Sequence, residues 1–158
     1  MKNFLWVLAL SLLWCNIGFA EIIRLEKCHD SDDVSFDYSR YDNRYMVIDL
    51  DKKISTMVTI RSDSDLKFLR ENAEKFVEEN PDYQLITFNK TFTHEEKIIY
   101  SDDNIIKTKS VVPKGHMRIT SESSVDLKNY TVDQSYETMN TETSKKHVIY
   151  PKYKCYHK

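Results

Sequence analysis

The chain contains the stretch Ile54-Ser55-Thr56-Met57-Val58-Thr59-Ile60-Arg61, in which two sets of side chains alternate along the backbone. One set is Ile54, Thr56, Val58 and Ile60, and the other is Ser55, Met57, Thr59 and Arg61. Successive side chains of a β-strand point to opposite faces of the sheet. The alternation therefore predicts a strand with one buried face and one face in water.

The composition also favours a sheet. From residue 21 onward the chain has 12 Ile, 9 Val, 11 Thr and 10 Tyr, but 6 Leu and a single Ala. β-Branched and aromatic side chains fit a pleated surface, whereas strong helix formers are scarce here. We predict a mainly β (α+β) fold, an antiparallel meander sheet that is barrel-like or lipocalin-like. Its strands are expected near residues 22–27, 34–41, 44–50, 54–61, 83–92, 96–101, 104–112, 116–126, 130–137 and 147–155.

One segment breaks the strand pattern, because its apolar residues recur at helical spacing: Leu66, Leu69, Ala73, Phe76 and Val77. This predicts one amphipathic helix near residues 65–79 that covers an end or a face of the sheet. Turns are expected at residues 42–43, 51–53, 102–104 and 128–129, where Asn, Asp and Lys are concentrated. Residues 93–96 are expected to form a further turn with a solvated charge run, and residues 138–146 a mobile loop.

Residues 1–20 have the features of a secretory signal peptide. Lys2 provides a short positive region, an apolar run follows from Phe4 to Trp14, and Gly18 and Ala20 precede Glu21. The apolar run is about half as long as a membrane span. We expect cleavage near Ala20, a secreted or periplasmic location, and a single β-rich domain over residues 21–158.

The leader ends Leu12-Leu13-Trp14-Cys15-Asn16-Ile17-Gly18-Phe19-Ala20, and a short predicted strand, an early Cys and a Cys close to the C-terminus follow it. In these features the chain resembles the small uncharacterised secreted or periplasmic proteins of AT-rich marine alphaproteobacteria. The resemblance covers mainly the leader. It implies a protein of the Gram-negative envelope, and it brings no activity with it.

Cleavage would leave two cysteines, Cys28 and Cys155, near opposite ends of the chain. Two cysteines in an oxidising compartment most simply form one disulfide. Two alternatives stay open from the sequence, namely a metal site that adds His29 and His157, and two free thiols. Because the spacing lacks the paired C-x-x-C or H-x-x-x-H pattern of zinc sites, we expect no metal and no cofactor.

Several functional classes are disfavoured by composition. A net charge of −2 gives no electrostatic reason to expect nucleic acid as a partner, and no apolar run is long enough for an integral membrane helix. From residue 21 onward Gly115 is the single glycine, which excludes glycine-rich phosphate loops. No two of the five histidines have i, i+4 spacing, and no G-x-S-x-G motif occurs.

The tyrosines gather near the two ends of the chain. Three lie near the first predicted hairpin and three near the C-terminus: Tyr38, Tyr41, Tyr45, Tyr150, Tyr153 and Tyr156. A disulfide would bring these ends together, and a closed antiparallel sheet places its first and last strands side by side. We therefore predict a ligand site that contains Tyr38, Tyr41, Tyr45, Tyr150 and Tyr153.

Two functional hypotheses follow from these patterns. The first is a non-catalytic binding or structural domain, for an unknown small ligand or an envelope protein. The second is an envelope enzyme, hydrolase-like, of unrecognised type. A buried pocket with two or more titratable groups at hydrogen-bond distance would favour the enzyme, and an apolar pocket would favour the binding domain.

Overall fold

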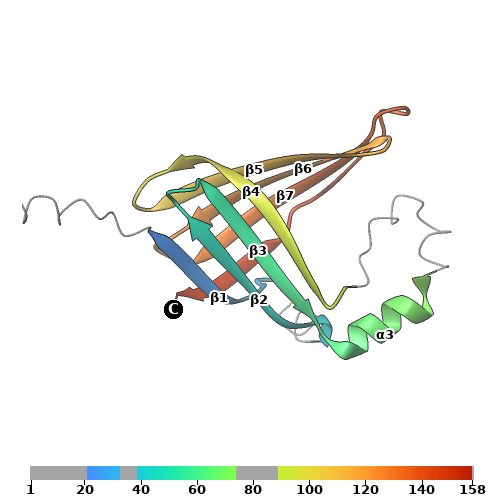
Figure 1. Ribbon diagram of the computed structural model, residues 1–158, viewed down its shortest axis with the longest axis horizontal. Helices are drawn as coiled ribbons and strands as arrows, with labels where there is room; N and C mark the ends of the chain where they lie inside the picture. The colour runs from blue at the N-terminus through green and yellow to red at the C-terminus, as the bar shows by residue number, and fades with distance from the viewer. Residues whose placement is uncertain (1–20, 33–38, 74–88, 158) are drawn as a thin grey trace, which may run out of the picture.

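The computed structural model describes residues 21–32, 39–73 and 89–157 (Figure 1). Its strands are antiparallel, and they are accompanied by one described helix, α3, over Asp63–Glu71. The mainly β fold is thereby confirmed. The strands are β1 (Ile22–Asp30), β2 (Tyr41–Asp49), β3 (Ile54–Arg61), β4 (Thr91–Ser101), β5 (Ile105–Lys114), β6 (Met117–Asp126), β7 (Thr131–Asn140), β8 (Lys146–Ile149) and β9 (Lys152–His157). Within the described residues, no helix is long and apolar enough to span a membrane.

The sheet closes on itself as an eight-stranded barrel. Its order is β6-β5-β4-β3-β2-β1-β9-β7, and pairing between β6 and β7 completes the ring. β8 and β9 pair with successive parts of β7, so the two short strands share the eighth position. At the end next to α3, the long ribbons of β5, β6 and β7 lean away from β2 and β3 (Figure 1).

A disulfide between Cys28 and Cys155 joins β1 to β9, as the cysteine count predicted. β1 pairs with β2 only as far as Leu25 opposite Met46, and beyond Glu26 its register with β9 shifts. Lys27, at this shift, has a φ of 49°. The bulge turns β1 away from β2, while the disulfide holds it against β9.

The barrel interior contains an apolar layer and a polar layer. The apolar layer is Leu25, Met46, Ile48, Met57, Ile106, Val125, Val132 and the disulfide. On β3 the inward set includes Ser55, Thr59 and Arg61, which are 2%, 3% and 8% exposed. The alternation in this strand was predicted correctly, but the buried face is the more polar of the two.

The helix expected near residues 65–79 begins at Asp63 and ends at Glu71, with Asn72 as its C-cap, and residues 74–79 lie outside the described part of the chain. Ser62 is the N-cap, and its hydroxyl oxygen accepts a hydrogen bond from the Asp65 backbone N–H. Leu66 and Leu69 are buried. Most of the strands predicted over residues 34–41 and 83–92 also falls outside the described part of the chain. Within the described residues, β2 begins at Tyr41 and β4 begins at Thr91.

Four local predictions were wrong. Residues 42–43 lie within β2, and residues 93–96 lie within β4 instead of forming turns. The loop expected over residues 138–146 is shorter, because β7 continues to Asn140 and β8 begins at Lys146. The last predicted strand is divided at Tyr150-Pro151, where proline has no N–H to donate to a ladder.

Replacing Cys28 and Cys155 together with Ser should lower the free energy of unfolding by about 2–4 kcal/mol, because the cross-link restricts the unfolded chain. Urea unfolding monitored by circular dichroism measures this difference. Adding a reducing agent should bring the wild-type protein to the value of the variant and leave the variant unchanged. Equal stability of the oxidised wild-type protein and the variant would contradict the prediction.

Candidate functional site

A buried carboxylate organises the polar layer of the barrel. Glu96 projects inward from β4 and is 3% exposed. It accepts hydrogen bonds from hydroxyl and amide groups on three following strands: Thr108, Ser121, Ser123 at 2.7 Å and Gln134 at 3.3 Å. His94 Nε2 lies 3.1 Å from Glu96 Oε1. We call these six residues the Glu96 cluster.

Strand register brings these donors together. Thr108 lies opposite Ser123 across β5 and β6, and Ser123 lies opposite Gln134 across β6 and β7. Burial by itself would raise the pKa of Glu96. The hydrogen bonds from His94, Ser121, Ser123 and Thr108 together outweigh burial and lower this pKa from 4.5 to about 2. Glu96 is therefore a carboxylate at neutral pH.

The pair formed by His94 and Glu96 meets part of the criterion that favours an enzyme, since both are titratable. However, His94 Nε2 faces both Glu96 Oε1 at 3.1 Å and Ser110 Oγ at 3.4 Å. A hydrolytic triad requires the carboxylate on one ring nitrogen and the nucleophile on the other. These three side chains consequently lack the arrangement of a serine hydrolase.

Aromatic rings and arginines alternate near the end of the barrel that carries α3. The Arg61 guanidinium lies 4.9 Å from the Phe92 ring and 5.9 Å from the Tyr41 ring. Arg44 lies 4.4 Å from the Tyr41 ring and 4.5 Å from the Tyr153 ring. Each guanidinium is thus within 6 Å of two aromatic rings, which is cation–π distance. We call Phe92, Arg61, Tyr41, Arg44 and Tyr153 the arginine stack.

Tyr136 lies between the Glu96 cluster and the arginine stack. Burial raises its pKa, and the neighbouring Tyr153 and Glu96 raise it further, against the opposing effects of Ser121 and Arg44. The Tyr136 phenol therefore stays protonated at neutral pH. Its ring also contacts His94 at a centroid distance of 5.5 Å, so the two polar groups of the interior are continuous.

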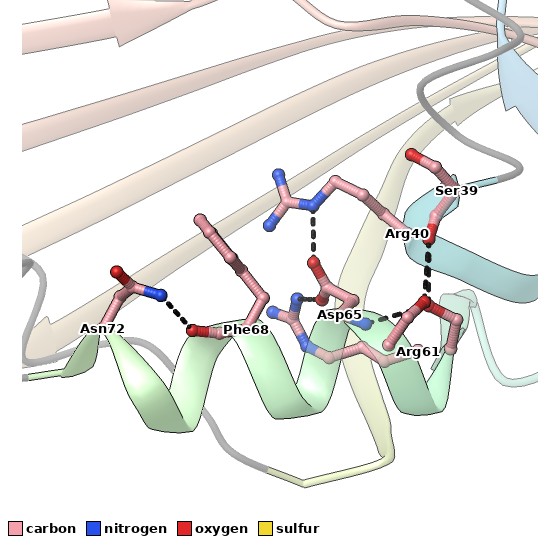
Figure 2. Close-up of polar contacts among 8 residues, drawn as sticks. Ser39, Arg40, Arg61, Asp65, Phe68 and Asn72 are labelled. Atoms are coloured by element: carbon pink, nitrogen blue, oxygen red, sulfur yellow. Dashed lines mark hydrogen bonds and ion pairs between the residues drawn. The ribbon is translucent and has the colours of Figure 1, made fainter.

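Helix α3 is fastened to the stack through Asp65 (Figure 2). Asp65 is 5% exposed. Its carboxylate accepts a hydrogen bond from Arg61 Nη1 at 2.6 Å and another from Arg40 Nε at 2.8 Å. Arg40 also lies 5.7 Å from the Tyr41 ring, so three guanidinium groups surround that ring. Within the described residues, Arg61 Nε is a buried N–H without a hydrogen-bond partner.

A hollow of about 400 Å³ opens beside the stack, where the ladder between β1 and β2 ends. We call it the side port. It gives access to Arg44 and Tyr41 through the wall of the barrel, and it lies next to the disulfide. Its walls are Glu26, Lys27, Cys28 and His29 of β1 and Tyr41, Asp42, Asn43 and Arg44 of β2.

The structure brings together two of the five tyrosines predicted for the ligand site. The rings of Tyr41 and Tyr153 both lie close to the Arg44 guanidinium, at 4.4 Å and 4.5 Å. Tyr45 lies elsewhere, 4.5 Å from the Arg24 guanidinium, and Tyr150 lines a separate groove. Tyr38 lies outside the described residues.

Sequence reasoning missed the arginines of the stack and the Glu96 cluster. The available signal was the position of Arg44 in phase with Met46 and Ile48, and of Arg61 in phase with Ser55 and Thr59. An arginine that continues an inward-facing set is a candidate for a buried functional group.

Among the described residues, no group of three or more His, Cys, Asp or Glu side chains is arranged to hold a metal ion. Both cysteines of the alternative metal site are joined in the disulfide. Comparison of the chain with protein-family models, curated proteins and solved structures gives no match.

Replacing Glu96 with Gln should destabilise the fold at neutral pH, by at most about 3 kcal/mol for a pKa lowered from 4.5 to about 2. Because the folded-state pKa is lowered, this contribution is complete above pH 4.5 and is lost as the pH falls toward 2. Urea unfolding between pH 7 and pH 2.5 measures this contribution. The difference in unfolding free energy between the wild-type protein and Glu96→Gln should become smaller as the pH falls.

Glu122→Gln provides the control for this experiment, because Glu122 lies on the outer face of β6 with 53% of its side chain exposed. The unfolding free energy of Glu122→Gln should differ little from that of the wild-type protein throughout the pH range. A difference for Glu96→Gln that stays constant or grows on acidification would contradict the prediction.

Proposed function

We propose that this protein is a non-catalytic binding domain, exported to the periplasm or the cell exterior, and that its ligand is a small anion bearing a carboxylate or phosphate. The observation that carries the proposal is the arginine stack beside the side port. The ligand would enter between β1 and β2 and meet Arg44 and Tyr41.

The geometry of stacked guanidinium groups supports an anionic ligand. The Arg44 guanidinium lies 4.4 Å from the Tyr41 ring and 4.5 Å from the Tyr153 ring, and Arg44 lines the side port. A carboxylate or phosphate oxygen binds guanidinium in the guanidinium plane, with shorter and stronger hydrogen bonds than a neutral acceptor makes.

The proposed location rests on the disulfide and on residues 1–20. Disulfides persist in oxidising compartments and are rare in the cytosol. The Cys28–Cys155 bond is compatible with such a compartment. The charged, apolar and small-residue regions that precede Glu21 would direct the chain there.

Replacing Arg44 with Gln should weaken binding of an anion by about tenfold or more, because a charge-assisted hydrogen bond contributes roughly 1.5–3 kcal/mol. Isothermal titration calorimetry at low ionic strength with citrate, inorganic phosphate and pyrophosphate measures this change. Arg44→Lys should retain part of the affinity, since it keeps the charge but loses the planar donor fork.

Arg118→Gln is the control. Arg118 lies on β6 with an exposed side chain, and it does not line the side port. This variant should bind the anions as the wild-type protein does. If none of the three anions binds, or if Arg118→Gln and Arg44→Gln have equal effects, the stack is purely structural and the proposed function is wrong.

Expression in a Gram-negative host should yield a protein whose N-terminus is Glu21. The expected cleavage follows from Gly18 and Ala20, which present small side chains to the signal peptidase. Intact-mass spectrometry of the periplasmic fraction measures the cleavage site. A protein that retains residues 1–20, or that is confined to the cytoplasm, would contradict the proposed location.

A further inference from the structure

A groove of about 330 Å³ crosses the outer surface of the barrel, and it is separate from the side port. Its lining includes Ile99 of β4 and Tyr150, which precedes β9. Ile99 is 61% exposed and Tyr150 72% exposed. Large apolar side chains left this open in the lining of a hollow are candidates for ligand contact.

Strand register explains why this surface is hollow. Lys107, Ser124, Asp133 and Lys152 face one another in sequence across β5, β6, β7 and β9. In the neighbouring row, Glu122 lies opposite Ser135. The two serines are short, and longer side chains stand around them, so they form the floor of the groove.

The charges in the groove are balanced and accessible. Lys107, Lys152, Glu122 and Asp133 all line the groove, and Glu122 also forms an ion pair with Lys109 at 2.6 Å. Asp133 and Lys152 form only a loose ion pair, 3.9 Å apart, with 65% and 60% of their side chains exposed. A strongly anionic ligand would meet two carboxylates here, and a strongly cationic ligand would meet two ammonium groups.

We propose that this groove binds a neutral oligosaccharide. Sugar hydroxyls both donate and accept hydrogen bonds, so they match a row in which carboxylates, hydroxyls and ammonium groups alternate. The exposed Tyr150 ring offers a flat apolar surface on which the C–H face of a sugar ring can pack, while its hydroxyl reaches water. The volume of the groove lies at the lower end of the range of small-molecule sites.

This proposal is independent of the anion site. The groove lies over β4 to β7 and β9, whereas the side port lies between β1 and β2, and the two hollows share no lining residue. Loss of anion binding in Arg44→Gln would therefore leave saccharide binding unchanged.

The test is a titration of the isotope-labelled protein with chitotetraose, cellotetraose and maltotetraose, followed by amide chemical shifts. At least one of these neutral sugars should shift the amides of Ser124 and Ser135. Tyr150→Ala should weaken that binding about tenfold, whereas Tyr150→Phe, which keeps the ring, should retain it. Ser135→Leu should also abolish binding, because it fills the floor while leaving Tyr150 in place.

Tyr100→Ala is the matched control, since Tyr100 is also exposed, at 49%, but does not line the groove. It should bind sugar as the wild-type protein does. Failure of all three sugars to bind at millimolar concentration would overturn the proposal. So would binding that survives both Tyr150→Ala and Ser135→Leu, or binding of a galacturonate oligomer in place of the neutral sugars.

Discussion

The Glu96 carboxylate is the constraint on which the barrel interior depends. A buried carboxylate is costly unless hydrogen bonds replace its lost hydration. Here they come from Thr108, Ser121, Ser123 and Gln134, which lie on three consecutive strands. Shifting any of these strands by one residue would turn its donor to the outside and leave the charge unsatisfied, so the carboxylate favours a single register.

The interior contains two environments. Leu25, Ile48 and Val132 pack with the disulfide as an apolar core, and Tyr153 of the arginine stack packs against this core. The polar part runs from the arginine stack through Tyr136 toward Glu96. The stability of the fold can therefore reside in the apolar part, while the polar part is arranged for ligand contact. Helix α3 supports that second part, because Asp65 orients Arg40 and Arg61.

The sequence predicted the fold class because strand periodicity is local. The alternation in Ile54–Arg61 and the turn at residues 51–53 both required information from only a few neighbouring residues. The inward face could not be identified in the same way, since Ser55 and Thr59 are buried only because they belong to a polar layer. For the same reason, residues 93–96 resembled a solvated turn, whereas Glu96 is buried by donors that lie 12 to 38 positions away.

Local sequence patterns also identified only part of the candidate site. Tyr41 and Tyr153 could be associated from sequence because a disulfide and barrel closure both bring the chain ends together. Arg44 and Arg61 could not be assigned, since a stack depends on cross-strand distances that periodicity does not contain.

The pairing of β1 with β9 also governs when the protein can fold. β1 is synthesised well before β9, one of its two partners, because 127 positions separate Cys28 from Cys155. Contacts of such long sequence separation slow folding, because a large loop must close before they form. The β2–β7 meander can assemble earlier, but the ring stays open until β9 has been synthesised. A chain without β9 would therefore expose unpaired edges of β1 and β7, which are natural sites for aggregation.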